Sequence, residues 1–374
     1  MATTNSAQQL LALTLIPHVG LKTTHALLEL EVSIDDLFRC SRAQLTSLGI
    51  PSLVARSIEA NCQGALARAQ AIIDQTKDTG VDIIAKGSKL YPPLLGECCD
   101  APAVLFVRGN HQVLSNPYAI SSVGTRHANG TGLKLTNQII TQAAQSGIGV
   151  SIVSGLALGI DRASHLAALE ANIPTVAVLP GFVDQITPTS HHSLARRIVN
   201  QGGALISEMP PMTPLSRGHF VSRNRIIAGL SSVTIMFQSA TKGGAMVTAD
   251  LANGYDREVF TPPSATDQVG FEGNIELLKS SRAHILSSFD DIAQLMNWNA
   301  KPKKSATDQR VAILESLTPQ ELKVYSVIPE SEPTSIDHIA YHANESVAKT
   351  SAILTMLEIK GLIYTSKGRL YHKL

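Results

Sequence analysis

Short apolar and β-branched runs alternate with helix-forming stretches from about Val81 to Trp298. This alternation constrains the fold most, because strands that are each followed by a helix form parallel sheets with the helices on the faces. Several runs are continuously apolar, as in strands covered on both sides. The predicted strands are Tyr118–Val123, Gly149–Ser154, Thr175–Leu179, Ala204–Ser207, Val233–Gln238 and Glu258–Thr261. The sequence therefore predicts an α/β fold with a parallel sheet.

Glycine-containing segments follow three of these strands: Gly124-Thr125-Arg126, Gly155 to Gly159, and Lys242-Gly243-Gly244. Ligands of open α/β sheets bind at the carboxyl edge of the strands. Glycine lets backbone approach an anion, and a helix start presents free N–H groups to it. We therefore expect an anion site at this edge. The spacing is neither G-x-G-x-x-G nor a P-loop, so no dinucleotide cofactor is predicted.

Arg223, Asn224 and Arg225 stand directly before the apolar run 226–230. Burying a guanidinium is costly unless a carboxylate or another anion meets it, and its planar fork suits phosphate. Residues two apart point to nearly opposite sides of a helix. We expect one arginine to reach a ligand and the other to serve the fold, while the sequence leaves open which. Internal salt bridges explain the segment equally well when it is taken alone.

The basic positions and glycine turns add up to several separated anion contacts, which a row of phosphates explains better than a single nucleotide does. Aromatic residues make up 4% of the chain, so base stacking should be sparse and sequence preference weak. The net charge of +1 requires a local binding patch. Asp161 is interpreted as a helix cap, with a catalytic carboxylate as the alternative, and His165 as structural. No metal-ligand cluster and no Ser-His-Asp signature is found, so neither a metal nor a catalytic residue is predicted.

Four regions are predicted along the 374 residues. Residues 1–74 are helical, with two glycine turns that resemble helix–hairpin–helix units; a packing role is favoured because basic residues do not cluster there. Residues 75–298 hold the sheet, and residues 299–309 form a charged, proline-containing linker. Residues 310–374 have the order of a winged helix. Charges balance along its would-be recognition helix, which favours a protein partner or self-contact over DNA.

The winged-helix interpretation comes from three helical runs followed by a hairpin. The runs are Leu322–Val327, Ser335–His342 and Glu345–Lys360, and the hairpin turns at Lys367-Gly368-Arg369.

At the N-terminal end of the chain, no basic run precedes the first apolar stretch, which Pro17 and Gly20 interrupt. A cytoplasmic protein without a membrane partner is therefore expected, with its four cysteines reduced.

Five segments in this order resemble the DNA-processing protein A family (DprA, also called Smf). They are Tyr91–Leu95 with Ala101–Gly109, Ser121–Arg126, Ser154–Asp161, Phe220–Leu230 and Lys242–Ala249. The resemblance covers roughly Val81 to Phe260. It implies an extended Rossmann-like core that forms homodimers, with a helical N-terminal domain and a C-terminal winged helix. It also implies binding of single-stranded DNA without marked sequence preference, protection of incoming strands, and help in loading the RecA recombinase during natural transformation.

The family is not regarded as enzymatic. By motif match, its DNA-contacting positions fall on Gly124, Arg126, Gly155, Gly159, Arg223, Asn224, Arg225, Lys242, Gly243 and Gly244. The chain departs from the family pattern in three places. Gly243-Gly244-Ala245 stands where Ser-Gly-Ser is common, Pro262-Pro263 replaces a frequent Pro-Gly, and the loop through Gly273-Asn274 is altered.

The rival interpretation is a Rossmann-like nucleotide N-glycosidase (phosphoribohydrolase). Such enzymes carry a Gly-Gly-x-Gly-Thr loop followed closely by Glu. Here Met246 replaces the third glycine, Thr248 arrives one residue late, and the carboxylate is Asp250. Aspartate is one methylene shorter, and a shortfall of that size disrupts a catalytic geometry. A purely structural adaptor leaves the anion sites unexplained, so single-stranded DNA binding is preferred.

Overall fold

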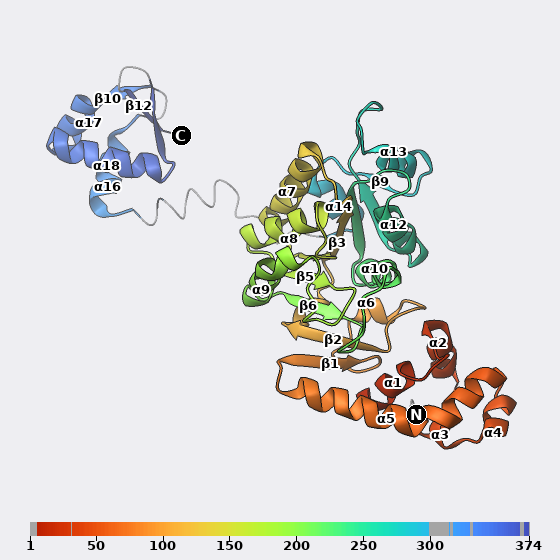
Figure 1. Cartoon of the computed structure of the whole chain (residues 1–374). Helices are drawn as coiled ribbons and strands as arrows, with labels where there is room; N and C mark the ends of the chain where they lie inside the picture. The colour runs from red at the N-terminus through yellow and green to blue at the C-terminus, as the bar shows by residue number, and fades with distance from the viewer. Residues whose placement is uncertain are drawn as a thin grey trace. The chain divides into compact units, whose positions relative to one another are not determined.

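A computed structural model describes residues 6–30, 32–298, 314, 317–329, 332–366 and 370–373 (Figure 1). The chain forms two compact units, Met1–Ala300 and Lys301–Leu374. The predicted linker, residues 299–309, lies outside the described residues, and so does the predicted wing tip Lys367-Gly368-Arg369.

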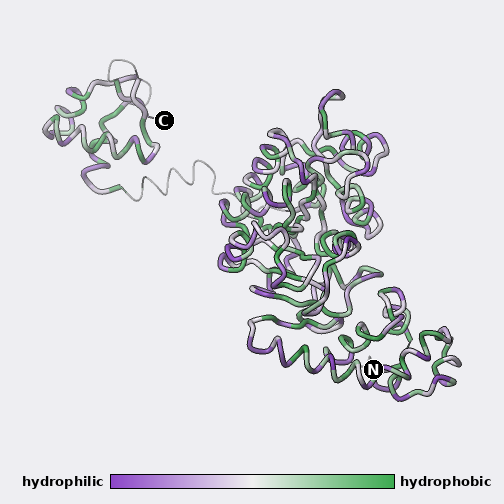
Figure 2. Tube along the Cα trace, in the orientation of Figure 1, coloured by the Kyte–Doolittle hydropathy of each residue, from purple (hydrophilic) through white to green (hydrophobic). Residues whose placement is uncertain are grey.

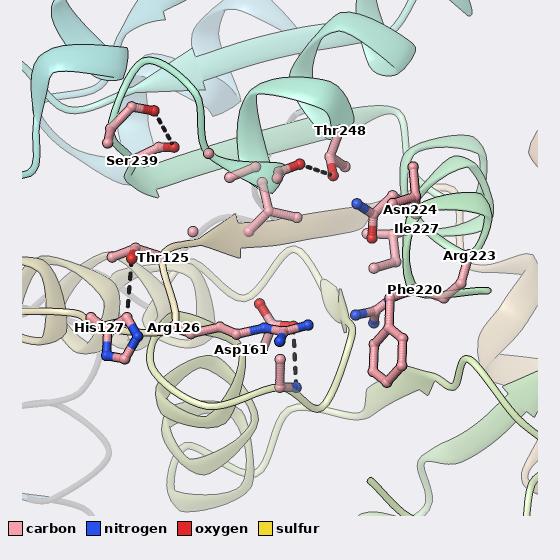
Figure 3. Close-up of a pocket in the computed structure, with 18 residues that line it drawn as sticks. Thr125, Arg126, His127, Asp161, Phe220, Arg223, Asn224, Ile227, Ser239 and Thr248 are labelled. Atoms are coloured by element: carbon pink, nitrogen blue, oxygen red, sulfur yellow. Dashed lines mark hydrogen bonds between the residues drawn. The ribbon is translucent and has the colours of Figure 1, made fainter. Parts of the chain in front are cut away.

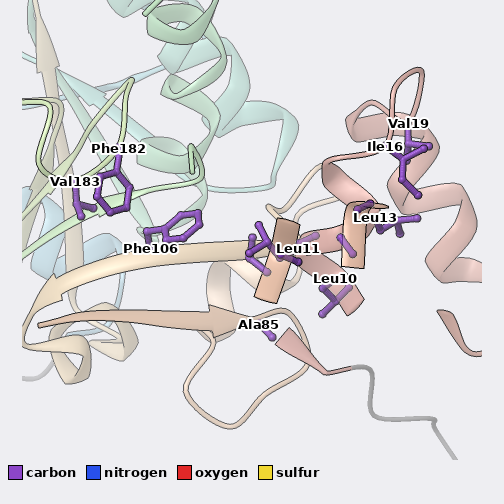
Figure 4. Packing of buried hydrophobic residues seen from close by; sticks show 14 of the residues in the cluster. Leu10, Leu11, Leu13, Ile16, Val19, Ala85, Phe106, Phe182 and Val183 are labelled. Carbon is purple, nitrogen blue, oxygen red and sulfur yellow. The ribbon is translucent and has the colours of Figure 1, made fainter. Parts of the chain in front are cut away.

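The first unit begins with helices that pack on the end of the sheet. They are α1 (Ala7–Thr14), α2 (Leu21–Glu29), α3 (Ile34–Arg39), α4 (Arg42–Ser47) and α5 (Ser52–Lys77). Ser6 and Gln9 form a capping box that satisfies the first N–H groups of α1. The buried Leu10, Leu11 and Leu13 of α1 belong to the same apolar cluster as Phe106 of the sheet (Figure 4). The N-terminal helices therefore share a core with the sheet, and a separate domain of residues 1–74 stays a prediction.

A nine-stranded sheet forms the centre of this unit. Its strands are β1 (Val81–Ala85), β2 (Val104–Gly109), β3 (Ala119–Gly124), β4 (Ser151–Ser154), β5 (Thr175–Val178), β6 (Ala204–Ser207), β7 (Val233–Gln238), β8 (Glu258–Thr261) and β9 (His284–Ile285). Their spatial order is β1-β2-β6-β5-β4-β3-β7-β8-β9. The seven strands from β6 to β9 are parallel to one another. The predicted α/β fold is confirmed, with a sheet that is mostly parallel.

Two pairings at one edge of the sheet are antiparallel. β1 pairs with β2, and β2 with β6, in antiparallel register. The link between β1 and β2 contains only the single turn α6 (Pro93–Gly96), without a crossover helix that would return the chain to the same end of the sheet. The bounds of β6, β7 and β8 coincide with those predicted, and those of β3, β4 and β5 differ by one or two residues. β1, β2 and the two-residue β9 were not predicted as strands.

Helices cover both faces of the sheet, which explains the continuously apolar strands. One face packs against α7 (Gly130–Gln145), α8 (Ile160–Glu170) and α14 (Phe289–Leu295). The other packs against α6, α11 (Asn224–Gly229), α12 (Gly244–Gly254) and α13 (Glu272–Lys279). The central strands are accordingly largely hydrophobic along the trace, whereas hydrophilic residues recur along the exposed α5 (Figure 2).

The order in which successive strands are added to the sheet reverses between β3 and β7. From β3 it adds β4, β5 and β6 on one side, and β7 then returns to pair with β3 on the other side, followed by β8 and β9. α9 (His192–Asn200) lies between β5 and β6 in the chain, and α10 (Arg217–Ser222) precedes α11. At such a switch point the connections leave in opposite directions and open a crevice outside the carboxyl ends of the two strands. The fold thus places a crevice beside the ends of β3 and β7.

The second unit is a small winged helix. It contains α16 (Pro319–Val327), β10 (Thr334–Ser335), α17 (Ile336–Ala343), α18 (Val347–Ile359), β11 (Ile363–Ser366) and β12 (Leu370–Lys373). Its three strands are antiparallel in the order β10-β12-β11, and β10 was not predicted. Lys349 pairs with Glu345 at 3.0 Å and Lys360 with Glu321 at 2.6 Å. These cations at and just after α18 are thus already matched by carboxylates of the same unit.

Candidate functional site

A cavity of about 360 Å³ opens at the switch point between β3 and β7 (Figure 3). Its walls come from the loop after β3, the start of α8, the α10–α11 segment and the loop that leads from β7 into α12. The lining residues are Val123, Gly124, Thr125, Arg126, His127, Ala157, Asp161, Phe220, Val221, Arg223, Asn224, Ile227, Ser239, Ala240, Gly243, Gly244, Ala245 and Thr248. Segments more than 100 residues apart in the chain thus form one site.

Arg126 reaches into this site from the loop after β3. Its side chain is exposed, and its guanidinium carbon lies 5.4 Å from the centre of the Phe220 ring. A guanidinium over an aromatic face gains about 0.5–1 kcal/mol at an exposed position. This contact holds the free charge over the cavity and links the β3 loop to α10.

Arg223 approaches from the junction of α10 and α11, and its side chain points toward that of Arg126 in Figure 3. The residue is 5% exposed, and its Nη1 donates to the carbonyl of Val178, the last residue of β5, at 2.9 Å. Within the described part of the chain, no carboxylate lies within ion-pair distance of it. Burial lowers the pKa of Arg223, and nearby Asp161 opposes this effect. The cavity therefore contains a buried cation whose counter-charge is incomplete.

Arg225 turns the other way, as its spacing from Arg223 requires. Its guanidinium forms an ion pair with Glu208 and donates to the carbonyl of Asp100 at 2.5 Å. Burial raises the pKa of Glu208, while the charge of Arg225 opposes that rise. Arg225 does not line the cavity, so the structure resolves which arginine serves the fold.

Asp161 corrects the helix-cap interpretation. Gly159, with φ of +73°, is the N-cap of α8, and Asp161 lies within the first turn. Its carboxylate is buried and accepts the N–H of Ala157 at 3.2 Å. Burial raises the pKa of Asp161, whereas Arg223 and the loop N–H groups lower it. The carboxylate of Asp161 thus engages an N–H group of the turn before α8, while the N–H group of Ile160 at the helix start donates to the carbonyl of Thr125.

The glycines of the predicted site bring loops into contact. A Cβ atom on Gly155 would overlap the guanidinium of Arg223, and one on Gly159 would overlap the backbone of Thr125 and Arg126. One on Gly124 would overlap Ile160. Of these three glycines only Gly124 lines the cavity. Gly155 therefore sets the position of Arg223, and Gly159 sets that of Arg126. A direct contact of Gly155 or Gly159 with DNA stays a prediction.

The start of α12 supplies the free helix N-terminus of the site. Gly243 is its N-cap, and the N–H groups of Gly244 and Ala245 have no acceptor among the described residues. Lys242 is exposed next to them but does not line the cavity, and it pairs with no carboxylate of the described chain. The macrodipole of a helix favours an anion at this position. An anion in the cavity would therefore meet backbone donors from one side and guanidinium groups from the other.

The structure thus brings together six of the ten predicted positions: Gly124, Arg126, Arg223, Asn224, Gly243 and Gly244. The remaining four, Gly155, Gly159, Arg225 and Lys242, lie outside the lining. The sequence interpretation missed Phe220, although an aromatic residue three positions before Arg223 was a visible signal. His165 is fully buried, with Nδ1 2.8 Å from Thr175 Oγ1, and does not line the cavity.

The described residues offer neither a metal-binding cluster nor a membrane-spanning helix. No three His, Cys, Asp or Glu side chains among them come together as a metal ion would need. None of their helices combines the length and apolar character required to cross a bilayer.

Comparison with known proteins identifies the family. Residues 82–297 match the family of DNA recombination-mediator protein A, and residues 300–369 match the DprA winged helix domain. Protein Smf of Synechocystis sp. is 31% identical over 76% of this chain and 78% of its own length, and Protein Smf of Escherichia coli is 32% identical over 76% of each. DNA processing protein DprA of Bacillus subtilis is 36% identical over 60% of this chain and 75% of its own length.

Two solved structures agree with this assignment. DprA of Streptococcus pneumoniae superimposes with a TM-score of 0.55 at 29% identity, over 64% of this chain and 84% of that one. DprA of Helicobacter pylori, described for its mode of binding single-stranded DNA, gives a TM-score of 0.52 at 27% identity, over 58% and 95%. The chain therefore belongs to the DNA recombination-mediator protein A family, whose members are also named DprA or Smf.

Proposed function

We propose that this protein binds single-stranded DNA, without marked sequence preference, along the carboxyl edge of its sheet. The observation that carries the proposal is Arg223, a buried guanidinium that lines the cavity and has no carboxylate of the described residues in ion-pair contact. Leaving such a charge incompletely matched costs free energy, and a bound phosphate would remove that cost. Arg126 and the start of α12 face the same space. The Helicobacter pylori relative, described for binding single-stranded DNA, supports this choice of anion.

A strand of nucleic acid fits the distribution of charge better than a single nucleotide. Arg126 and Arg223 line the cavity, whereas Lys242 lies outside it at the start of α12. A ligand that meets all three must extend beyond the cavity. Phe220 is the only Phe, Tyr or Trp in the described lining, and Arg126 already covers its ring. Base stacking is therefore minor, and phosphate contacts should dominate the affinity.

The wider role is our inference from family membership. We infer that the protein protects incoming single strands and helps load the RecA recombinase onto them during natural transformation, in the cytoplasm and as a homodimer through the Rossmann-like domain. Membership in a family named for recombination mediation supports this inference, and so does the match to DprA proteins of Bacillus subtilis and Streptococcus pneumoniae.

The decisive test is the salt dependence of DNA binding. Arg126→Ala and Lys242→Ala should each flatten the plot of log affinity against log salt by about 0.7, the value for one phosphate contact of a single strand. Both should weaken mixed-sequence and poly-dT oligonucleotides alike. Arg68→Ala, an exposed arginine of α5 away from the cavity, is the matched control and should leave the slope unchanged. Wild-type slope and affinity in both site variants would refute the proposed DNA site.

The enzymatic alternative has its own discriminating experiment. Asp250 does not line the cavity, and its carboxylate pairs with Arg282 at 2.7 Å. Asp161 does line it, but its carboxylate is engaged by the loop N–H groups. We propose that the protein is not a nucleotide hydrolase. Wild type should release no base from AMP or GMP, and Asp250→Asn should bind DNA normally. Base release that disappears in Asp250→Asn would instead establish an N-glycosidase.

A further inference from the structure

His191 lies buried beneath the turn that follows β4. It ends the short helix η2 (Thr189–His191) and is 3% exposed. Its Nδ1 is 2.8 Å from the carbonyl oxygen of Leu156. A carbonyl only accepts, so Nδ1 carries the proton and the imidazole donates. His191 lies outside the five short segments on which the sequence resemblance rests, and it does not line the cavity.

The turn that His191 holds has an unfavourable backbone conformation. Leu156 has φ of +56°, in the left-handed region that residues with a Cβ atom avoid, and its side chain is fully buried. Such a conformation persists only where the surrounding structure enforces it. The apolar core fixes the side chain of Leu156, and the hydrogen bond from His191 fixes its carbonyl group.

The same turn sets the position of the buried cation. Gly155, directly before Leu156, lies against the guanidinium of Arg223. Ala157, directly after it, donates its N–H to Asp161 at 3.2 Å. Arg223 and Asp161 both line the cavity. A shift of the Leu156 turn would therefore move the surface on which the guanidinium of Arg223 rests, together with the nearest carboxylate.

The neighbouring imidazole, His165, does not take over this role. Its Nδ1 lies 2.8 Å from Thr175 Oγ1, and that hydroxyl donates to the carbonyl of Ile152 at 2.9 Å. Nδ1 of His165 must therefore donate to Thr175, which leaves Nε2 unprotonated and without a partner in the described chain. Burial lowers the pKa of His165 to about 3, with His191 and Arg223 adding to the effect. His165 stays neutral and adds no charge to the cavity.

We propose that His191 is a positioning residue for the DNA site: it holds the Leu156 turn and, through Gly155, keeps the guanidinium of Arg223 facing the cavity. His191 itself makes no contact with DNA. The proposal deepens the proposed function and rests on it, because it concerns the same site.

The first test needs no DNA. His191→Asn places an amide nitrogen close to the position of Nδ1 and keeps the donor, whereas His191→Leu removes it. Hydrogen–deuterium exchange on the full chain should be faster in the peptide covering residues 155–161 of His191→Leu, and close to wild type in His191→Asn. Equal protection of this peptide in wild type and His191→Leu would overturn the proposal, whether or not the protein binds DNA.

The second test measures binding of a mixed-sequence single strand. His191→Leu should bind about tenfold more weakly, as for the loss of one charge-assisted contact, and its salt slope should be lower by about 0.7. His191→Asn should restore both. In an Arg223→Ala background, His191→Leu should have no further effect, because it acts through Arg223. An equal loss in both backgrounds would overturn the proposal. Wild type that binds no single strand would refute the proposed function, while the exchange experiment would still decide the role of His191.

Discussion

The guanidinium of Arg223 rests directly on the backbone of Gly155, with no room for a side chain between them. Gly155→Ala should therefore displace the guanidinium from the cavity wall. We expect single-strand affinity to fall about tenfold, as for the loss of one charge-assisted contact. Gly64→Ala is the matched control, because a Cβ atom at this position of α5 meets nothing within 4 Å. Titration of both variants by fluorescence anisotropy checks the prediction, and equal affinities would contradict it.

The buried carboxyl group of Asp161 should make stability depend on pH. Burial raises its pKa in the folded protein, so the folded state binds this proton more tightly than the unfolded state. Its contribution to the free energy of unfolding is therefore greatest below the unfolded pKa of about 3.9 and is lost as pH rises through the folded pKa. Relative to Asp161→Asn, wild type should gain stability as pH falls from about 7 toward 4.5. Urea unfolding of both proteins at several pH values measures the difference, and a constant difference would argue against a raised pKa.

A chain that ends at Trp298 should fold and keep most of its single-strand affinity, because every residue lining the cavity lies in the first unit. The shortened chain should include Trp298 itself. Trp298 is buried, and its ring meets that of Tyr118 edge to face at 5.4 Å between centroids. Trp298→Ala in the shortened chain should cost about 3–5 kcal/mol of the free energy of unfolding. Circular dichroism and DNA titration test both statements. A natively folded truncation that no longer bound DNA would move the site to the winged helix.

The sheet edge at β9 offers a surface for the proposed homodimer. β9 is the last strand of the sheet, and Ile285 on it is 57% exposed. An exposed apolar edge strand has unpaired backbone N–H and C=O groups that can pair with a strand of another chain. Ile285→Lys should lower the fraction of dimer in analytical ultracentrifugation. Leu53→Lys, at a comparably exposed leucine of α5, should leave it unchanged. A dimer of undiminished affinity in Ile285→Lys would place the interface elsewhere.

Patterns within short stretches of sequence were sufficient for much of the fold. The bounds of β6, β7 and β8 follow from apolar runs that end at glycine, proline or polar residues, since strand and turn preferences act over a few residues. Strand direction does not follow in this way. β1 and β2 have apolar patterns similar to those of the parallel strands, and only their pairing with each other and with β6 makes them antiparallel.

At the candidate site, too, some features follow from the sequence and others only from tertiary packing. The sequence by itself determined the family, the α/β class and the order of the glycine-containing and basic segments, and helix periodicity required that Arg223 and Arg225 point apart. Only the tertiary structure decided that Arg223 faces the cavity while Glu208 holds Arg225, that Asp161 occupies the loop N–H groups, and that His191 supports Leu156. The physical reason is distance along the chain. Each of these contacts depends on side chains that packing of the sheet brings together, and local propensity carries no information about such partners.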